Sequence, residues 1–224
     1  MINRKNTKDV DMDKVIAILK KEVVKYDVPV IDLIKIQTDE PFKILIGTIL
    51  SARTKDSMTA KVLERLFEKV KSFDDLENLS ENEIASLIYP VGFYKNKAKH
   101  LKELPKVIRD EFDGEIPRAV DDLVKLPGVG RKTANLVSSV AFEEDAICVD
   151  THVHRITNRL GYVSTKKPLE TEMTLRKKLP TKHWHWINRL FVAFGQNICT
   201  PISPHCSICP IKEKCNRIGV NTNR

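Results

Sequence analysis

Hydrophobic side chains recur three or four positions apart along most of the chain, which is the spacing of one face of an α-helix. Two of the clearest stripes are Val15, Ile16, Leu19 and Val23, and Val62, Leu63, Leu66, Phe67 and Val70. Asp11 or Asp13 can cap the first of these helices, and the second begins after Asp56. No segment shows the alternating pattern of a β-strand. The predicted fold class is therefore all-α.

Several local signals indicate where other helices begin and end. Residues 39–41 open a helix, because proline is tolerated in a first turn and acidic residues favour its positive end. Ser80 and Glu83 form a capping-box pattern that begins another helix. A helix over 95–112 contains Pro105, which predicts a kink or a break at that point. Further helices are expected over 118–125, 131–142, 151–160, 168–179 and 182–197.

Composition and charge add a class of partner. The chain has 224 residues, 42% of them hydrophobic, which is enough for one domain or two small lobes. Its net charge of +8 favours a polyanionic partner, although many basic proteins bind no nucleic acid. Residues 1–14 lack the apolar core of a signal peptide, and the longest apolar run, 42–50, is too short to span a bilayer. We therefore expect a soluble intracellular protein, in the cytoplasm or nucleoid, with no membrane partner.

A turn with two glycines, between two predicted helices, is the most informative segment. Residues 126–135 read LPGVGRKTAN, and both glycines can adopt backbone angles closed to other residues and allow a ligand close to the backbone. The N–H groups of the turn and of the next helix N-terminus then form an anion site. On a basic chain the natural anion is a DNA phosphate. We assign DNA contact to Leu126, Pro127, Gly128, Val129, Gly130 and Arg131.

Two other glycine motifs fail at this turn. A phosphate-binding P-loop would need a glycine directly before Lys132, where Arg131 stands. A dinucleotide-binding fingerprint would need a preceding strand and a third glycine in place of Thr133. An ordinary turn between two helices remains open as an interpretation of this segment.

The cysteines indicate a metal site rather than disulfides. Four of the five cysteines crowd into a C-x6-C-x2-C-x5-C pattern near the C-terminus, and a reducing compartment disfavours disulfide bonds. These four are Cys199, Cys206, Cys209 and Cys215. Four thiolates at this spacing suit either a zinc ion or a [4Fe–4S] cluster, and the spacing alone hardly separates the two. Cys148 is left over and is expected to be a small core residue.

The LPGVGRKTAN segment, followed by Val149, Asp150, Thr151 and His152, resembles the helix–hairpin–helix and catalytic aspartate of the endonuclease III family. The resemblance runs from about Pro41 to Cys215. It implies that Lys132 is the nucleophile, that Asp150 is the catalytic aspartate and that the four clustered cysteines hold a [4Fe–4S] cluster. It also implies a two-lobed helix–hairpin–helix DNA glycosylase fold. A helical barrel domain would span 35–145, and a discontinuous iron–sulfur cluster domain would combine 1–34 with 146–224.

The chemistry suits Lys132 and Asp150 independently of the resemblance. A lysine attacks only as the free amine, and partial burial, a place in a helix's first turn and the neighbouring Arg131 all disfavour the ammonium form. Asp150 directly precedes a predicted helix, where a carboxylate can cap it and stabilise positive charge on a sugar. The plain alternatives are a surface lysine and a simple cap.

Two loops are expected to fill the space that a flipped nucleotide leaves in the duplex. By resemblance they lie at 51–56 and 91–94, with Arg53 where bacterial members commonly have glutamine and Phe93 at a wedge position. Core packing is the alternative for Phe93. Lys212 and Lys214, within the cysteine segment, are expected to contact the DNA backbone. Tyr89, Trp184 and Trp186 are expected in the core.

The resemblance implies a bifunctional DNA N-glycosylase and abasic-site lyase that acts in base-excision repair. It would excise oxidised pyrimidines such as thymine glycol through a lysine Schiff base and β-elimination. The partner would be double-stranded DNA with damaged bases or abasic sites, and the enzyme is expected to be a monomer. Two alternatives stay open. One is a monofunctional mismatch glycosylase of the same fold, and the other is a non-catalytic helix–hairpin–helix DNA-binding module.

Overall fold

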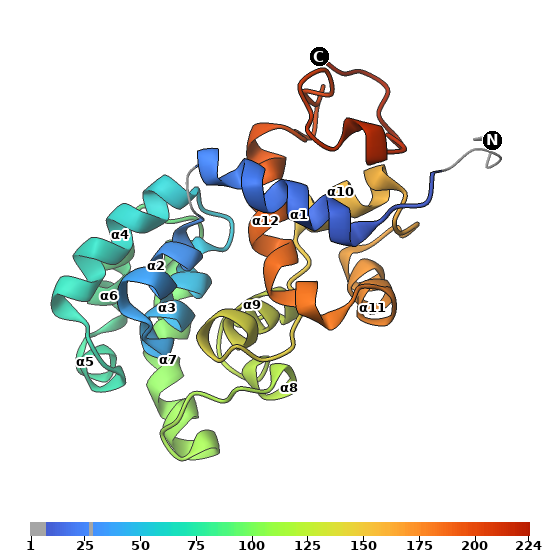
Figure 1. Cartoon of the computed structure of the whole chain (residues 1–224). Helices are drawn as coiled ribbons and strands as arrows, with labels where there is room; N and C mark the ends of the chain where they lie inside the picture. The colour runs from blue at the N-terminus through green and yellow to red at the C-terminus, as the bar shows by residue number, and fades with distance from the viewer. Residues whose placement is uncertain (1–7, 27–28) are drawn as a thin grey trace. The chain divides into compact units, whose positions relative to one another are not determined.

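The computed structural model describes residues 8–26 and 29–224, and within these ranges it contains helices and no strand (Figure 1). The all-α prediction is confirmed. The chain divides into two compact units: one is Pro29–Ala146, and the other joins the N-terminal segment to Ile147–Arg224. The first unit begins six residues before the boundary expected from the sequence, because α2 (Val30–Thr38) belongs to it.

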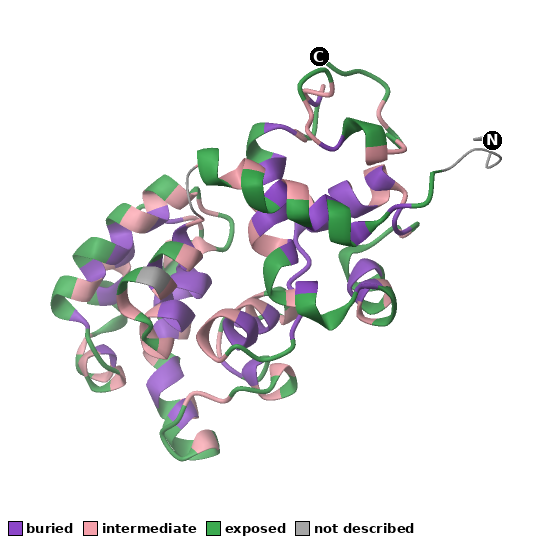
Figure 2. Cartoon of the chain, in the orientation of Figure 1, coloured by how far each residue is buried: buried purple, intermediate pink, exposed green. Residues whose placement is uncertain are grey.

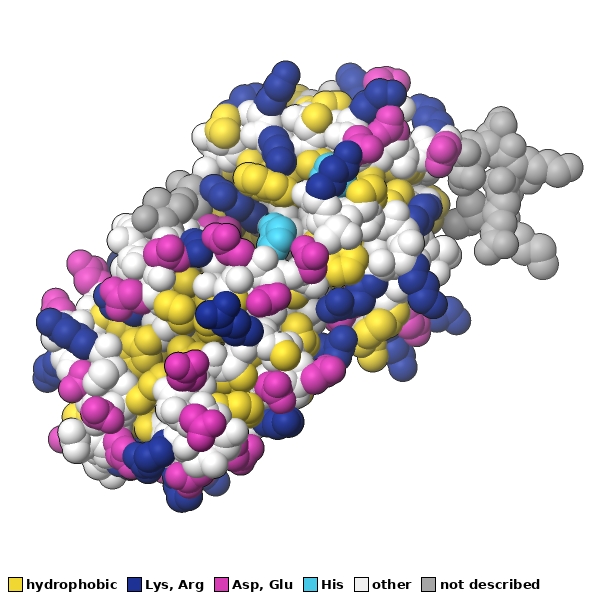
Figure 3. All heavy atoms as spheres, turned by 60° about the horizontal axis from the view of Figure 1, so that its bottom comes forward, with side chains coloured by type: hydrophobic (Ala, Val, Ile, Leu, Met, Phe, Trp, Pro, Cys, Tyr) yellow, Lys and Arg dark blue, Asp and Glu magenta, His cyan; other side chains and the backbone are white. Residues whose placement is uncertain are grey.

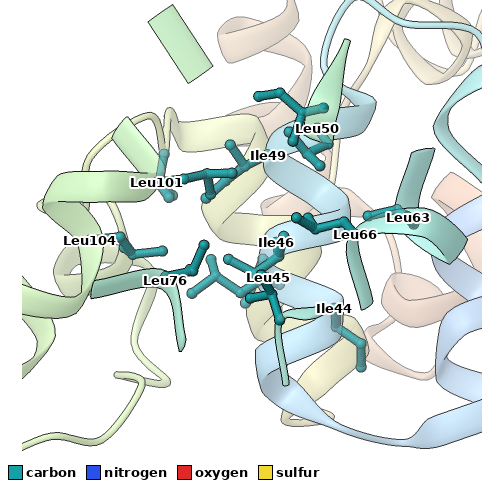
Figure 4. Packing of buried hydrophobic residues seen from close by; sticks show 14 of the residues in the cluster. Ile44, Leu45, Ile46, Ile49, Leu50, Leu63, Leu66, Leu76, Leu101 and Leu104 are labelled. Carbon is teal, nitrogen blue, oxygen red and sulfur yellow. The ribbon is translucent and has the colours of Figure 1, made fainter. Parts of the chain in front are cut away.

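The Pro29–Ala146 unit is built around α3 (Pro41–Ser51). Residues 44–50 of this helix are all buried, so α3 is covered on every side. Figure 4 shows its side chains packed among Leu63, Leu66, Leu76, Leu101 and Leu104. The helices that follow in this unit are α4 (Asp56–Lys69), α5 (Phe73–Asn78), α6 (Glu81–Ile88), α7 (Tyr94–Phe112), α8 (Val120–Leu123) and α9 (Arg131–Ala141).

Proline or capping residues mark the starts of three helices in this unit, α3, α5 and α6. Pro41 is the first residue of α3, and the predicted capping box at α6 is present, with the Ser80 N–H donating to Glu83 Oε2 at 2.7 Å. The sequence reading missed α2 and also α5, which has a capping box of its own. Helix α7 runs through Pro105 without interruption, so the prediction of a break at this residue is wrong.

The second unit contains α1 (Met12–Glu22), α10 (Thr151–Leu160), α11 (Pro168–Lys178) and α12 (Trp184–Asn197), with the short 3-10 turns η2 (Val23–Lys25), η3 (Thr181–His183) and η4 (Lys212–Lys214). Helix α12 packs against both α1 and α10. Asp11 caps α1, since its side chain accepts from the Lys14 N–H at 3.1 Å. Asp13 instead binds Lys182 and His183, each at 2.6 Å.

Each unit has its own hydrophobic core, and most helices are buried along one face and exposed along the other (Figure 2). Trp184 packs partly buried against the core of the second unit, as expected. Tyr89 is 57% exposed and Trp186 is 37% exposed, so the core prediction is wrong for both. The Lys20 ammonium lies 3.7 Å from the centre of the Trp186 ring. No helix in the described part of the chain is long and apolar enough to cross a membrane.

The burial of α3 predicts a large cost for shortening one of its side chains. Replacing the fully buried Leu45 by alanine leaves a cavity and is expected to lower the free energy of unfolding by about 3 kcal/mol. The control is Leu33→Ala on α2, at an exposed leucine, with an expected loss below about 1 kcal/mol. Urea unfolding followed by circular dichroism measures both. Equal losses in the two variants would contradict the central place of α3.

Candidate active site

The glycine turn connects α8 to α9, and its hydrophobic side chains pack into the core of the Pro29–Ala146 unit. Leu126 and Val129 are buried, so their side chains hold the turn in place, and their N–H groups donate within it to the carbonyls of Leu123 and Leu126, at 3.2 and 3.1 Å. Gly128 has φ +76°, and a Cβ atom there would lie 2.8 Å from His100 Nδ1. The special backbone expected for Gly128 is thus confirmed. Gly130 has φ −85°, which any residue adopts, so that expectation is wrong for it.

Lys132 is the second residue of α9, in the first turn of the helix, as the sequence predicted. Its side chain is exposed, so the expected partial burial is wrong. The helix is fixed below it by the buried Ala134 and Asn135. The neighbouring Arg131 guanidinium lies 3.7 Å from an Asp121 oxygen, and this ion pair offsets the like charge that Arg131 was expected to supply. Lys132 is therefore an accessible amine on a rigid helix.

Asp150 is buried, with 9% of its surface exposed, and is the N-cap of α10. Its Oδ1 atom accepts the N–H groups of His152 and Val153, both at 2.8 Å. The predicted cap is confirmed. A cap and a catalytic carboxylate are compatible, because two short bonds fix the orientation of the group. The pairing of Asp150 with Lys132 stays a prediction, since the two residues belong to different units.

The two loops expected to enter the duplex share an unusual backbone. Arg53 has φ 56° and Phe93 has φ 59°, the left-handed region that costs a residue with a side chain about 1–2 kcal/mol. The Arg53 guanidinium carbon lies 5.2 Å from the centre of the Phe93 ring, within the range of a cation–π contact. Phe93 is 59% exposed, so core packing is wrong as its explanation. Its role as a wedge stays a prediction.

Lys97, in the first turn of α7, ties these two loops together, and the sequence reading missed it. Only 7% of its surface is exposed. Its Nζ atom donates to the carbonyls of Leu50 and Ala52, at 2.8 and 2.6 Å, and to the Thr54 hydroxyl at 3.3 Å. Burial lowers the pKa of Lys97 to about 8. A lysine at the positive end of a helix opposes the helix dipole, and that mismatch was the available signal.

The same Thr54 hydroxyl also accepts the Gly92 N–H at 3.1 Å. A Cβ atom on Gly92 would lie 2.5 Å from the Arg53 carbonyl oxygen, so only glycine lets the loops approach this closely. The 51–56 and 91–94 loops thus meet backbone to backbone. Their contact fixes where Arg53 and Phe93 emerge.

The four clustered cysteines line one cavity of the second unit. The Cys199 sulfur accepts from the Arg159 guanidinium and the Cys215 sulfur accepts from the Arg217 N–H, each at 3.3 Å. Burial raises the pKa of Cys209 to about 11, so its thiolate form needs a nearby positive charge. Lys212 also lines the cavity and is exposed, whereas Lys214 is half-buried. Cys148 is buried, as expected.

Figure 3 shows basic and acidic side chains interspersed with hydrophobic ones on the face that it presents. Several lysines of the chain are paired with carboxylates, for example Lys125 with Asp122 at 2.7 Å. The charge on this face therefore does not by itself indicate where DNA binds.

Comparison with known proteins gives the family. The model of the "HhH-GPD superfamily base excision DNA repair protein" family matches residues 46–181. The solved structure of a non-covalent endonuclease III–DNA complex superposes with a TM-score of 0.82 and 36% identity, over 92% of this chain and 94% of that chain. A trapped covalent endonuclease III–DNA intermediate superposes with a TM-score of 0.78 and 36% identity, over 93% and 97%. The fold and the site thus define a base-excision repair protein of the HhH-GPD superfamily.

Sequence relatives narrow this class. Endonuclease III of Thermotoga maritima is 44% identical over 176 residues, which is 79% of this chain and 83% of that protein. The chloroplastic endonuclease III homolog 2 of Arabidopsis thaliana is 48% identical over 183 residues, 78% of this chain. The aligned part covers only 47% of the plant protein. The chain belongs to the endonuclease III family.

The buried ammonium of Lys97 predicts a pH dependence of stability. Its pKa is about 8 in the folded chain and near 10.5 when exposed, so between these values the unfolded chain binds more protons. The free energy of unfolding should therefore rise with pH across this window, by on the order of 1–2 kcal/mol after allowance for solvent screening. In Lys97→Met this contribution to the rise should be absent, while the contributions of all other titratable groups stay the same. Denaturant unfolding at intervals from pH 7.5 to about 10.5 measures the difference. A constant difference between the two proteins would contradict burial of the charge.

Proposed function

We propose that this chain is a bifunctional DNA N-glycosylase and abasic-site lyase of base-excision repair, with Lys132 as its nucleophile. The observation that carries the proposal is the position of Lys132, an exposed lysine in the first turn of α9 directly behind a rigid glycine turn. Membership of the endonuclease III family supports it, since one similar structure is a covalent endonuclease III–DNA intermediate. The proposed substrate is double-stranded DNA, and the proposed location is the cytoplasm or nucleoid.

The reaction begins with attack of the Lys132 amine on C1′ of the damaged nucleotide. The C1′–N bond breaks, and the base leaves with the electron pair of that bond and takes up a proton. The attached amine loses one proton, its lone pair opens the C1′–O4′ bond, and O4′ takes up a proton, which gives a protonated Schiff base between Nζ and C1′. Asp150 stabilises the positive charge that develops on the sugar, with its carboxylate held by two N–H groups of α10.

Strand cleavage follows from the Schiff base. The protonated imine acidifies C2′, a proton leaves it, and its electron pair expels the 3′ phosphate by breaking the C3′–O bond. One fragment then carries a 5′ phosphate. Water hydrolyses the imine, releases an unsaturated aldehyde on the other fragment and restores the Lys132 amine. A monofunctional enzyme would use water as the nucleophile and would not cut the strand, and the accessible Lys132 argues against it.

The substrates are oxidised pyrimidines such as thymine glycol, together with abasic sites. The backbone of the 126–131 turn and the N-terminus of α9 bind a phosphate, while the buried Leu126 and Val129 keep that backbone rigid. Arg53 and Phe93 are exposed on neighbouring loops and fill the space left by the flipped nucleotide. Lys212 and Lys214 contact the DNA backbone.

The four cysteines Cys199, Cys206, Cys209 and Cys215 hold a [4Fe–4S] cluster. All four thiols line one cavity, and membership of the endonuclease III family supports a [4Fe–4S] cluster rather than a single zinc ion there. The Cys199 and Cys215 sulfurs each accept an N–H group, from Arg159 and Arg217, as thiolate ligands of a metal commonly do. The cluster closes the C-terminal segment and stabilises it.

Replacing Lys132 by glutamine tests the nucleophile. Strand cleavage at thymine glycol and at an abasic site should fall by on the order of 10³-fold or more, because the amine that forms the Schiff base is gone. The control is Lys125→Gln, at an exposed lysine paired with Asp122, which should keep most activity. Cleavage is followed on labelled duplexes in single-turnover assays.

Other outcomes would select the alternative functions. Base release without strand cleavage by the unsubstituted chain would indicate a monofunctional glycosylase. Binding with no preference for damaged over undamaged DNA, and no base release, would indicate a non-catalytic binding module. Cleavage retained in full by Lys132→Gln would move the nucleophile to another residue.

Metal analysis tests the cofactor. The purified chain should contain about four iron atoms and about four acid-labile sulfides, and Cys209→Ser should lose most of both. The matched control is Cys148→Ser, a buried cysteine outside the cavity, which should keep the iron. About one zinc and no iron per chain would contradict the cluster.

A further inference from the structure

A shared polar centre lies between the 51–56 and 91–94 loops, and Lys97 is its only charged member among the contacts described above. The ammonium has three hydrogens and donates to three oxygens: the carbonyls of Leu50 and Ala52 and the Thr54 hydroxyl. The first two belong to the C-terminal end of α3, where a cation is favoured by the helix dipole. Lys97 itself is in the first turn of α7, one turn after Phe93. Lys97 therefore joins the C-terminal end of α3, where the 51–56 loop begins, to the N-terminal end of α7, which follows the 91–94 loop.

Lys97 is unsuited to be a second nucleophile. Its Nζ atom is enclosed, only 7% of the residue's surface is exposed, and all three hydrogens are donated to protein oxygens. An amine bound in this way has neither a lone pair nor a path to a sugar carbon. Its ammonium instead holds the Ala52 carbonyl, directly before Arg53 in the chain. Phe93 is the N-cap of the same helix, one turn before Lys97.

We propose that Lys97 is a positioning residue that locks the two loops into one rigid unit, so that Arg53 and Phe93 enter the duplex together. This rests on the proposed function only for the role of that pair in filling the gap opposite a flipped nucleotide. Both residues have left-handed backbone conformations that a free loop would leave. The Lys97 bonds and the Thr54–Gly92 bond hold the loops in them. The Arg53 guanidinium then rests against the Phe93 ring, and the two present one surface.

The test compares duplex and single-stranded DNA that contain the same abasic site. The chemistry at Lys132 is identical in both, but only the duplex has an opposite strand for Arg53 and Phe93 to engage. Lys97→Met keeps the length of the side chain and removes its donors. We expect its kcat/KM on the duplex to fall about 10- to 100-fold, while borohydride trapping on the single strand stays within about twofold of the unsubstituted chain.

A binding measurement separates this proposal from the proposed function. A duplex with a tetrahydrofuran abasic analogue has no aldehyde, so its affinity does not depend on Schiff-base chemistry. The unsubstituted chain should prefer it to undamaged duplex, and Lys97→Met should lose about tenfold of that preference. If trapping fails for the unsubstituted chain but this preference and its loss are seen, the lyase proposal fails and the positioning role stands.

Two further variants guard against a general loss of structure. Lys102→Met is the matched control, on the same helix, with an Nζ atom that donates to the Glu77 carbonyl at 2.6 Å and does not contact either loop. It should leave the ratio of duplex to single-strand activity unchanged. Thr54→Val removes the hydroxyl shared by Lys97 and Gly92 and keeps both carbonyl bonds. It should give a smaller loss, on the duplex alone, even if Lys97→Met does not fold.

Non-additivity provides the decisive comparison. In a chain that already carries Arg53→Ala and Phe93→Ala, Lys97→Met should cause no further loss on the duplex, since the residues that it positions are absent. An equal loss on duplex and single strand would show that Lys97 serves only general stability and would overturn the proposal. So would an unchanged duplex activity, or a full additional loss in the triple variant.

Discussion

Helix α3 is buried on every side, so the carbonyl groups at its C-terminal end need hydrogen-bond donors from the protein itself. The Thr48 carbonyl accepts the Ser51 hydroxyl, and the Ser51 carbonyl accepts the Thr54 N–H. The carbonyls of Leu50 and Ala52 both accept from Lys97. The bonds that satisfy the end of α3 thus also fix the start of α7 and the loop that carries Arg53. The same bonds shape the surface that we propose to contact DNA.

The two residues proposed for the chemistry each lie at the N-terminal end of a helix. Lys132 lies in the first turn of α9, and Asp150 caps the first turn of α10. A helix N-terminus favours an anion and disfavours a cation. Both side chains therefore lie at the positive end of a helix dipole, Asp150 buried and Lys132 exposed.

The sequence predicted well those features that depend on near neighbours in the chain. Period, proline and capping residues located most helices, and the cap at Asp150 and the conformation of Gly128 followed from the same local rules. Helix α2 was missed because no side chain caps its start, and α5 because Asp75 stands where a capping box usually has glutamate or glutamine. The exposure of Tyr89, Phe93 and Trp186 depends on partners distant in the sequence, and no local pattern reports it. Lys97 was missed because its acceptors lie more than forty residues earlier, and the one local signal was its place at the positive end of α7.

We propose different roles for two lysines: the chemistry for the exposed Lys132, and the positioning of two loops for the buried Lys97. A depressed pKa commonly marks a catalytic lysine, which makes Lys97 the natural competitor for the role of nucleophile. The most direct measurement is peptide mapping by mass spectrometry of the adduct that borohydride traps between the unsubstituted chain and abasic DNA. The sugar remnant should be found on the peptide that contains Lys132. A remnant on Lys97, or on any other lysine, would contradict this division of roles.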